Sequence, residues 1–123
     1  MLKDLVVIYG WPTFTRVGPE ASIAALKILL QSDAGEKDFV LACNAAIQTA
    51  VDHGECDAVY GAYAHDLCAV LSGQDQTYGT RIDPARGRPY PIKDLVGVDS
   101  RRRSVGLRPL REELDAHRVP TPR

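Results

Sequence analysis

Residues 36–53, EKDFVLACNAAIQTAVDH, hold the pattern that decides the fold of this chain. Their apolar members recur at steps of three and four residues, the spacing of one face of an α-helix: Phe39, Val40, Cys43, Ala46, Ile47, Ala50 and Val51. Gly54 follows and suits the left-handed position that commonly ends a helix. The stretch therefore predicts a helix from about Glu36 to His53 with one buried face.

Helices are also predicted on both sides of this one. Upstream, Pro19 and Glu20 favour a helix start, and an apolar stripe leads to Gly35. Downstream, Asp57 can cap a helix that ends at Gly73 and is rich in alanine and glycine, which permit close contact between helices. Three helices joined by short glycine turns predict an antiparallel bundle.

The two ends of the chain differ from this middle part. The first nine residues are predicted as the end of a further helix, stopped at Gly10. After the bundle, short strands are predicted at 77–82 and 89–92, with a turn sequence between them. Two short helices are predicted beyond the strands, at residues 99–106 and 109–117.

The predicted fold class is mainly α with a minor β part: an antiparallel helical bundle followed by a short C-terminal β-hairpin. A chain of 123 residues fits one domain, predicted to span residues 1–118. Residues 119–123, which include two prolines, are predicted as a flexible tail.

Composition is that of a soluble globular protein, with 45% apolar and 25% charged residues. The net charge of −1 provides no field that would attract nucleic acid or anionic lipid. No apolar run approaches the roughly 20 residues that a membrane-spanning helix needs. We therefore predict a cytoplasmic protein without nucleic-acid or membrane partners, and leave its oligomeric state open.

The three cysteines, Cys43, Cys56 and Cys68, include no Cys-x-x-Cys pair. Cys43 lies among aliphatic neighbours at helical spacing, where a thiol is usually a small buried apolar group. We expect reduced structural thiols, with Cys43 buried and unreactive. No cofactor is predicted.

A histidine–aspartate pair, His65-Asp66, invites comparison with HD-type metal sites, in which His53 and Asp99 would supply further ligands. Two neighbouring residues of a helix do not point the same way, however. A histidine in the last turn of a helix, such as His53, is often only a partner of the helix dipole. No metal site is predicted.

The basic run Arg101-Arg102-Arg103 is the main positive patch of the sequence, extended by Arg108 and Arg111. We interpret it as a solvated helix face that pairs with nearby acidic residues: Asp99, Glu112, Glu113 and Asp115. A nucleic-acid surface would need a net positive domain and exposed aromatic residues, and the sequence indicates neither.

A polar element, residues 76–81 (QTYGTR), lacks helical periodicity and favours an extended chain bent at its glycine. Its two ends, Gln76 and Arg81, would place an amide and a guanidinium near the bend. We predict a small polar site here, with Asp66 as acid–base group, Gln76 and Tyr78 as hydrogen-bond donors and Arg81 as an anion clamp.

Two more residues complete the candidate ligand-binding set. Gln31 lies at the end of the helix that begins at Pro19, where it can border the same site. Trp11 can stack on a ligand, although a plug that seals one end of the bundle is the simpler interpretation of a lone tryptophan.

Six motifs, spread over nearly the whole chain, resemble in their order the bacterial "domain of unknown function 6624" family. They are Gly10-Trp11-Pro12-Thr13, Val17-Gly18-Pro19-Glu20, Gln31-Ser32-Asp33-Ala34, Tyr63-Ala64-His65-Asp66, Gln76-Thr77-Tyr78-Gly79-Thr80 and Val98-Asp99-Ser100-Arg101-Arg102. The Gln-x-Tyr-Gly-Thr element is the most specific of them. The resemblance implies no particular activity.

The chain departs from this family pattern at three polar positions. Ser32 stands where the family has histidine, Leu67 where it has arginine, and Arg81 where it has a second glutamine. The N-terminal helix that members usually carry is also short. If those family residues act together in a site, this chain has replaced all of them.

Two functions fit these observations. The first is a non-catalytic interaction or accessory module, in which the polar element holds the hairpin on the bundle, and the lost histidine favours it. The second is a small enzyme of a biosynthetic pathway, or a ligand-binding protein, that takes an anionic or polar metabolite in a pocket near Asp66, Gln76, Tyr78 and Arg81. The charge gained at Arg81 favours this second function. The expected partner is accordingly a protein or a small anionic metabolite.

Overall fold

The computed structural model describes residues 18–116 of the chain. The helix predicted in the first nine residues, Trp11 and the tail predicted at 119–123 lie outside the described residues. Within them, the predicted mainly α fold with a minor β part is confirmed.

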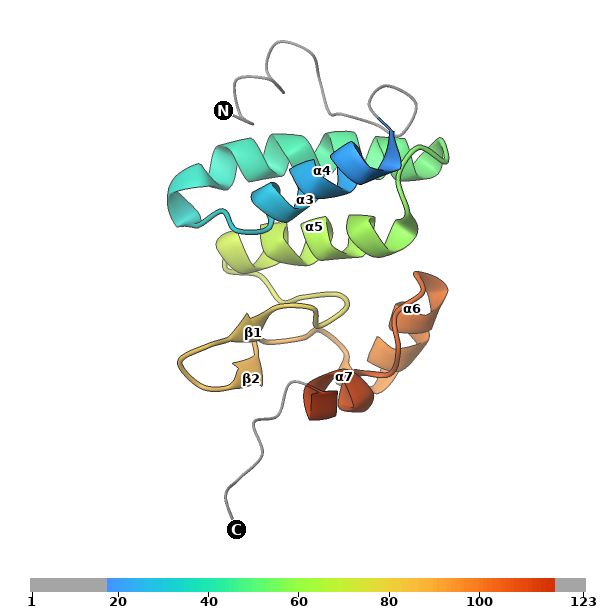
Figure 1. The fold of residues 1–123 in the computed structure, drawn as a ribbon. Helices are drawn as coiled ribbons and strands as arrows, with labels where there is room; N and C mark the ends of the chain where they lie inside the picture. The colour runs from blue at the N-terminus through green and yellow to red at the C-terminus, as the bar shows by residue number, and fades with distance from the viewer. Residues whose placement is uncertain (1–17, 117–123) are drawn as a thin grey trace.

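Three helices form one layer of the structure: α3 (Pro19–Leu29), α4 (Lys37–Asp52) and α5 (Ala58–Leu71). Each runs opposite to the one before it, as an antiparallel bundle requires (Figure 1). The most extensive helix–helix contact joins α4 and α5. On its other side, α5 faces the C-terminal part of the chain, so it lies in the middle of the molecule (Figure 1).

The helix ends follow the predicted signals with two exceptions. Gly54 and Gly73 have φ values of 72° and 70°, as expected of glycines that end helices. α3 ends at Leu29 rather than near Gly35, because the Asp33 carboxylate accepts a hydrogen bond from Gly35 N at 2.9 Å and starts the 3₁₀ turn η1 (Ala34–Glu36). Asp57 occupies the N-cap position of α5 without making the predicted side-chain capping bond.

The C-terminal part begins with an antiparallel hairpin of β1 (Ile82–Asp83) and β2 (Arg88–Pro89), in which Ile82 pairs with Pro89 and Asp83 with Arg88. The 3₁₀ turn η2 (Leu95–Gly97) leads into α6 (Val98–Ser104), and α7 (Leu110–Ala116) follows. The hairpin and both short helices were predicted, but the strands are shorter than 77–82 and 89–92. Residues 77, 78 and 80 direct their backbone N–H groups at a side chain of α5 instead of a neighbouring strand.

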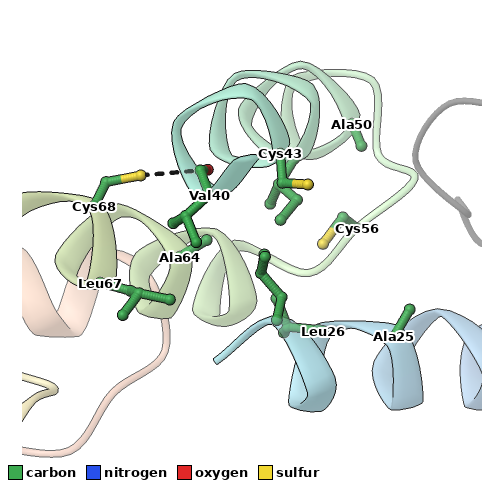
Figure 2. Packing of buried hydrophobic residues seen from close by; sticks show 11 residues of the cluster. Ala25, Leu26, Val40, Cys43, Ala50, Cys56, Ala64, Leu67 and Cys68 are labelled. Carbon is green, nitrogen blue, oxygen red and sulfur yellow. Dashed lines mark hydrogen bonds between the residues drawn. The ribbon is translucent and has the colours of Figure 1, made fainter. Parts of the chain in front are cut away.

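The apolar core lies between the three bundle helices, as Figure 2 shows for part of it. Leu29 of α3, Val40 and Ile47 of α4, and Leu67 of α5 are completely buried. Gly61 lets α5 approach α4 closely: a Cβ atom there would lie 2.9 Å from Val51 Cγ2, and its carbonyl oxygen accepts a bond from Gln48 Nε2 at 2.8 Å. The expectation that small residues bring these helices together is confirmed here.

All three cysteines are free, as predicted, and all three are buried, although burial was predicted only for Cys43. Burial, and to a smaller extent neighbouring Cys68, raises the pKa of the Cys43 thiol to about 11. Burial likewise raises the pKa of Cys68 to about 11, and this thiol donates to the Val40 carbonyl (Figure 2). Both thiols therefore stay protonated near neutral pH and act as core residues.

Replacing Cys43 with serine should lower the free energy of unfolding by about 1–3 kcal/mol, because a hydroxyl would be buried without an assured partner. Urea unfolding measures this loss. The matched control is Ala45→Ser, at an exposed position of the same helix, which should change stability by no more than about 0.5 kcal/mol. Rapid maleimide labelling of Cys43 in the native protein would contradict its burial.

Among the described residues, no helix is long and apolar enough to cross a membrane.

Candidate functional site

The 76–81 loop is organised around the carboxylate of Asp66, which is completely buried on α5. Its Oδ1 accepts hydrogen bonds from Thr77 N at 2.9 Å and Tyr78 N at 3.1 Å. Its Oδ2 accepts from Thr80 N at 2.9 Å and from Thr80 Oγ1 at 2.8 Å. Each oxygen thus accepts two bonds, which satisfies the carboxylate without a ligand.

Gly79 allows the loop to turn around this carboxylate. Its φ of 70° is one that residues with a Cβ atom rarely adopt, and a Cβ atom here would lie 2.7 Å from Ile92 Cδ1. The predicted bend at Gly79 is present, and it places the N–H groups of residues 77, 78 and 80 on the same side of the loop.

Gln76 closes the base of the loop and is also completely buried. Its Oε1 accepts from Arg81 N at 2.8 Å, while its Nε2 donates to the carbonyl oxygens of Arg81 and Tyr90, both at 3.0 Å. The side-chain amide therefore pairs with the Arg81 backbone as a neighbouring strand would. This explains why an amide suits the position.

Two arginines of α6 bind the opposite side of the loop, where the carbonyl oxygens of residues 77 and 78 point. Arg101 Nε donates to Thr77 O at 2.8 Å, and Arg102 Nη1 donates to Tyr78 O at 2.7 Å. Arg102 Nε also donates to Arg108 O at 2.7 Å. The loop is thus held between Asp66 and these arginines.

The prediction that the basic run forms a solvated face is wrong for Arg102, whose exposed fraction is 1%. It is wrong because loop carbonyl groups that face away from Asp66 need donors, and arginine supplies several from one side chain. Arg103 remains exposed, and the predicted kind of surface ion pair occurs between Arg108 and Glu113.

Arg81 anchors the loop to the first bundle helix. Its Nη1 donates at 3.0 Å to the carbonyl oxygen of Leu30, the residue that caps α3. A positive charge at the C-terminal end of a helix is favourable. Burial lowers the pKa of the Arg81 guanidinium, whereas Tyr90 and Asp66 act in the opposite direction. The guanidinium thus has a protein partner of its own.

The structure brings Asp66, Gln76, Tyr78 and Arg81 together around one loop. Gln31 is exposed and follows Leu30, whose carbonyl oxygen accepts the bond from Arg81. The ring of Tyr78 contacts the His65 ring edge-on, with a 6.1 Å centroid distance and an interplanar angle of 77°. Trp11 belongs to the part of the chain that the structure does not describe. The polar atoms of Gln76 bond to the protein's own backbone, and those of Asp66 bond to backbone N–H groups and to the Thr80 hydroxyl.

An open cleft of about 580 Å³ lies beside the 76–81 loop. It is lined by none of the four residues Asp66, Gln76, Tyr78 and Arg81. Their sequence neighbours His65 and Thr77 do line it, and His65 Nε2 lies 2.9 Å from Thr77 Oγ1. The complete lining is Leu41, Asn44, His65, Cys68, Ala69, Ser72, Gln74, Asp75, Thr77 and Lys93. Asp66, Gln76 and Tyr78 are thus each one position away from a residue that lines the cleft, whereas Arg81 is not.

A metal site is not formed by the described residues, since none of their His, Cys, Asp and Glu side chains gather in a group of three or more that could hold an ion. His65 faces the cleft, whereas Asp66 is enclosed by the 76–81 loop. The two members of the histidine–aspartate pair therefore point to different sides of α5.

Searches of protein-family models, curated proteins and solved structures find no match to this chain. The resemblance to the "domain of unknown function 6624" family therefore stays a prediction.

Proposed function

We propose that this chain is a non-catalytic binding or accessory module, in which Asp66, Gln76, Tyr78 and Arg81 hold the C-terminal part on the helical bundle. The observation that carries this proposal is the Asp66 carboxylate, whose two oxygens accept four hydrogen bonds from residues 77–80. A general base must reach the proton that it removes from a substrate. Asp66 has no exposed surface through which it could do so.

The best alternative for catalysis is the threonine–histidine contact in the cleft, which has the distance expected of a nucleophile and its base. Acyl transfer also needs donors for the developing oxyanion. In the adjoining 76–81 loop, the N–H groups of residues 77, 78 and 80 already donate to Asp66. A binding function in the cleft is therefore better supported than a reaction there.

Replacing Arg81 with glutamine tests the proposal. If Arg81 acts as an anchor, the free energy of unfolding should fall by about 1–2 kcal/mol, because the bond to the Leu30 carbonyl at the helix end is lost. Binding of acetate and inorganic phosphate, measured by calorimetry, should be the same with and without the substitution. Thermal unfolding gives the stability.

Arg86→Gln is the matched control, because Arg86 is exposed and its one side-chain partner within residues 18–116 is Asp83, three residues away. It should change the free energy of unfolding by less than about 0.5 kcal/mol. An Arg81→Gln variant with wild-type stability that has lost an anion site would overturn the proposal and favour the small enzyme or metabolite-binding protein that uses Arg81.

A further inference from the structure

The cleft beside the 76–81 loop (lining residues given above) has one wall made by the backbone segment that leads into the loop. Gln76 pairs with Ile92 in a parallel β-bridge, and Lys93 N donates to Gln76 O at 2.9 Å. Side chains alternate across extended chain, and that of Gln76 points inward. Its neighbours Asp75 and Thr77 therefore face the cleft, together with Lys93 from the adjoining segment.

The other wall comes from two bundle helices. On α5 and its C-cap, the lining residues occur at helical steps, with His65 followed by Cys68, Ala69 and the capping Ser72. On α4, Leu41 and Asn44 lie one turn apart. The walls thus combine small apolar groups with polar ones, the usual mixture in a site for a small molecule.

The charged groups of the cleft are free to meet a ligand. The side chains of Asp75 and Lys93 make no hydrogen bond or ion pair with any residue that the structure describes. The cleft therefore offers one negative and one positive group that do not neutralise each other directly. A ligand that carries both a positive and a negative charge can place each of them next to the cleft residue of opposite charge.

Two further side chains add polar groups. Asn44 Oδ1 already accepts from Gln48 Nε2 at 3.0 Å, so its unused group is the NH₂ donor. His65 uses Nε2 in its contact with Thr77, which leaves Nδ1 without a partner among the described residues, as a donor or an acceptor according to the tautomer. The Asn44 NH₂ group suits a carboxylate oxygen more than a second ammonium group.

We infer that the cleft binds a small zwitterion of the amino-acid class. Its ammonium group meets Asp75, its carboxylate meets Lys93 and the Asn44 amide, and a short side chain packs on Leu41 and Ala69. A cleft of about 580 Å³ lies within the ordinary range of small-molecule sites. A simple dianion would gain from Lys93 but be repelled by Asp75. The inference rests on the proposed function, because it takes the chain to bind its ligand without transforming it.

Three probes of similar shape separate the contributions of the two charges: L-norvaline, pentanoate and butylamine. In two-dimensional NMR titrations, L-norvaline should shift the backbone amide signals of cleft residues saturably, with a Kd of about 1 mM or tighter. Pentanoate and butylamine should each bind at least about tenfold more weakly, because each keeps only one of the charged groups.

Two substitutions assign the groups. Asp75→Asn should weaken L-norvaline about fivefold without weakening pentanoate, which loses a repulsive charge, whereas Lys93→Gln should weaken both L-norvaline and pentanoate. Asp52→Asn and Lys27→Gln are the matched controls, since both residues are exposed on bundle helices and neither lines the cleft. Both controls should bind L-norvaline as the unaltered chain does.

Pentanoate binding as tight as that of L-norvaline would overturn the inference, as would an absence of saturable shifts at the cleft. If either result occurs while Arg81→Gln still lowers stability, the anchoring role stands and only the ligand class is wrong. Consumption of L-norvaline during the titration would instead overturn the non-catalytic function.

Discussion

Asp66→Asn is expected to lower the free energy of unfolding by about 3–5 kcal/mol. The substitution keeps the shape of the side chain but turns one acceptor oxygen into an NH₂ group. In one orientation of the amide, that NH₂ group meets two donors, Thr77 N and Tyr78 N. In the other it meets the donor Thr80 N and the Thr80 hydroxyl, which can rotate to accept. Hydrogen bonds to a buried charge are among the strong ones, and at least one of them is lost in either orientation.

Urea unfolding followed by circular dichroism measures this effect, and NMR hydrogen exchange shows where it acts. The amides of residues 77, 78 and 80 should lose protection first. Asp75→Asn is the control, because Asp75 is exposed and has no partner among the described residues. An Asp66→Asn variant as stable as this control would refute the structural role of Asp66.

Arg102→Ala should cost about 2–4 kcal/mol of unfolding free energy. The substitution removes the donors for Tyr78 O and Arg108 O and leaves a cavity where a buried side chain had been. Part of the loss is offset, because Arg102 Nη2 is itself buried without a hydrogen-bond partner among the described residues.

The adjacent residue is the control. Arg103→Ala removes the same charge from an exposed position of the same helix and should change the free energy by less than about 0.5 kcal/mol. Arg102→Met fills the volume of the side chain without supplying donors. Its free energy of unfolding should therefore lie between that of Arg102→Ala and that of the unaltered chain. Equal stability of Arg102→Ala and Arg103→Ala in urea unfolding would contradict the buried role.

Much of the fold could be predicted because the bundle follows from local signals. The period of 36–53 and the glycines at 54 and 73 identify the apolar face and the helix ends without any knowledge of long-range contacts. α4 accordingly begins and ends within one residue of its predicted limits. The limits of the hairpin strands, in contrast, depend on a long-range contact. The N–H groups of residues 77 and 80 donate to the carboxylate of Asp66 on α5 instead of to a neighbouring strand.

Part of the cleft could be located from the sequence to within one residue, because Asp66 and Gln76 each adjoin a lining residue, but Arg81 and Gln31 do not. α5 is packed on both sides, by the bundle and by the C-terminal part, so it lacks the polar face that marks exposed positions (Figure 1). Asp66 therefore looks like a reactive group in a helix, although it is buried, and its neighbour His65 faces the cleft. An alternation rule applied around Gln76 would have found Asp75 and Thr77, but only with the knowledge that Gln76 points inward.

The separation of apolar and polar contacts has a consequence for how the chain opens. Among the described residues, every buried hydrophobic side chain except Val98 lies within residues 25–69, whereas the C-terminal part is held by hydrogen bonds to buried Asp66, Gln76 and Arg102. Release of residues 76–116 leaves the apolar cluster between α3, α4 and α5 in place, so this step carries a smaller heat-capacity change and a weaker dependence on denaturant than unfolding of the bundle. Unfolding of the bundle carries the large values of both. The molecule thus contains two cooperative units of different thermodynamic character, coupled by the hydrogen bonds of Asp66, His65 and Arg81.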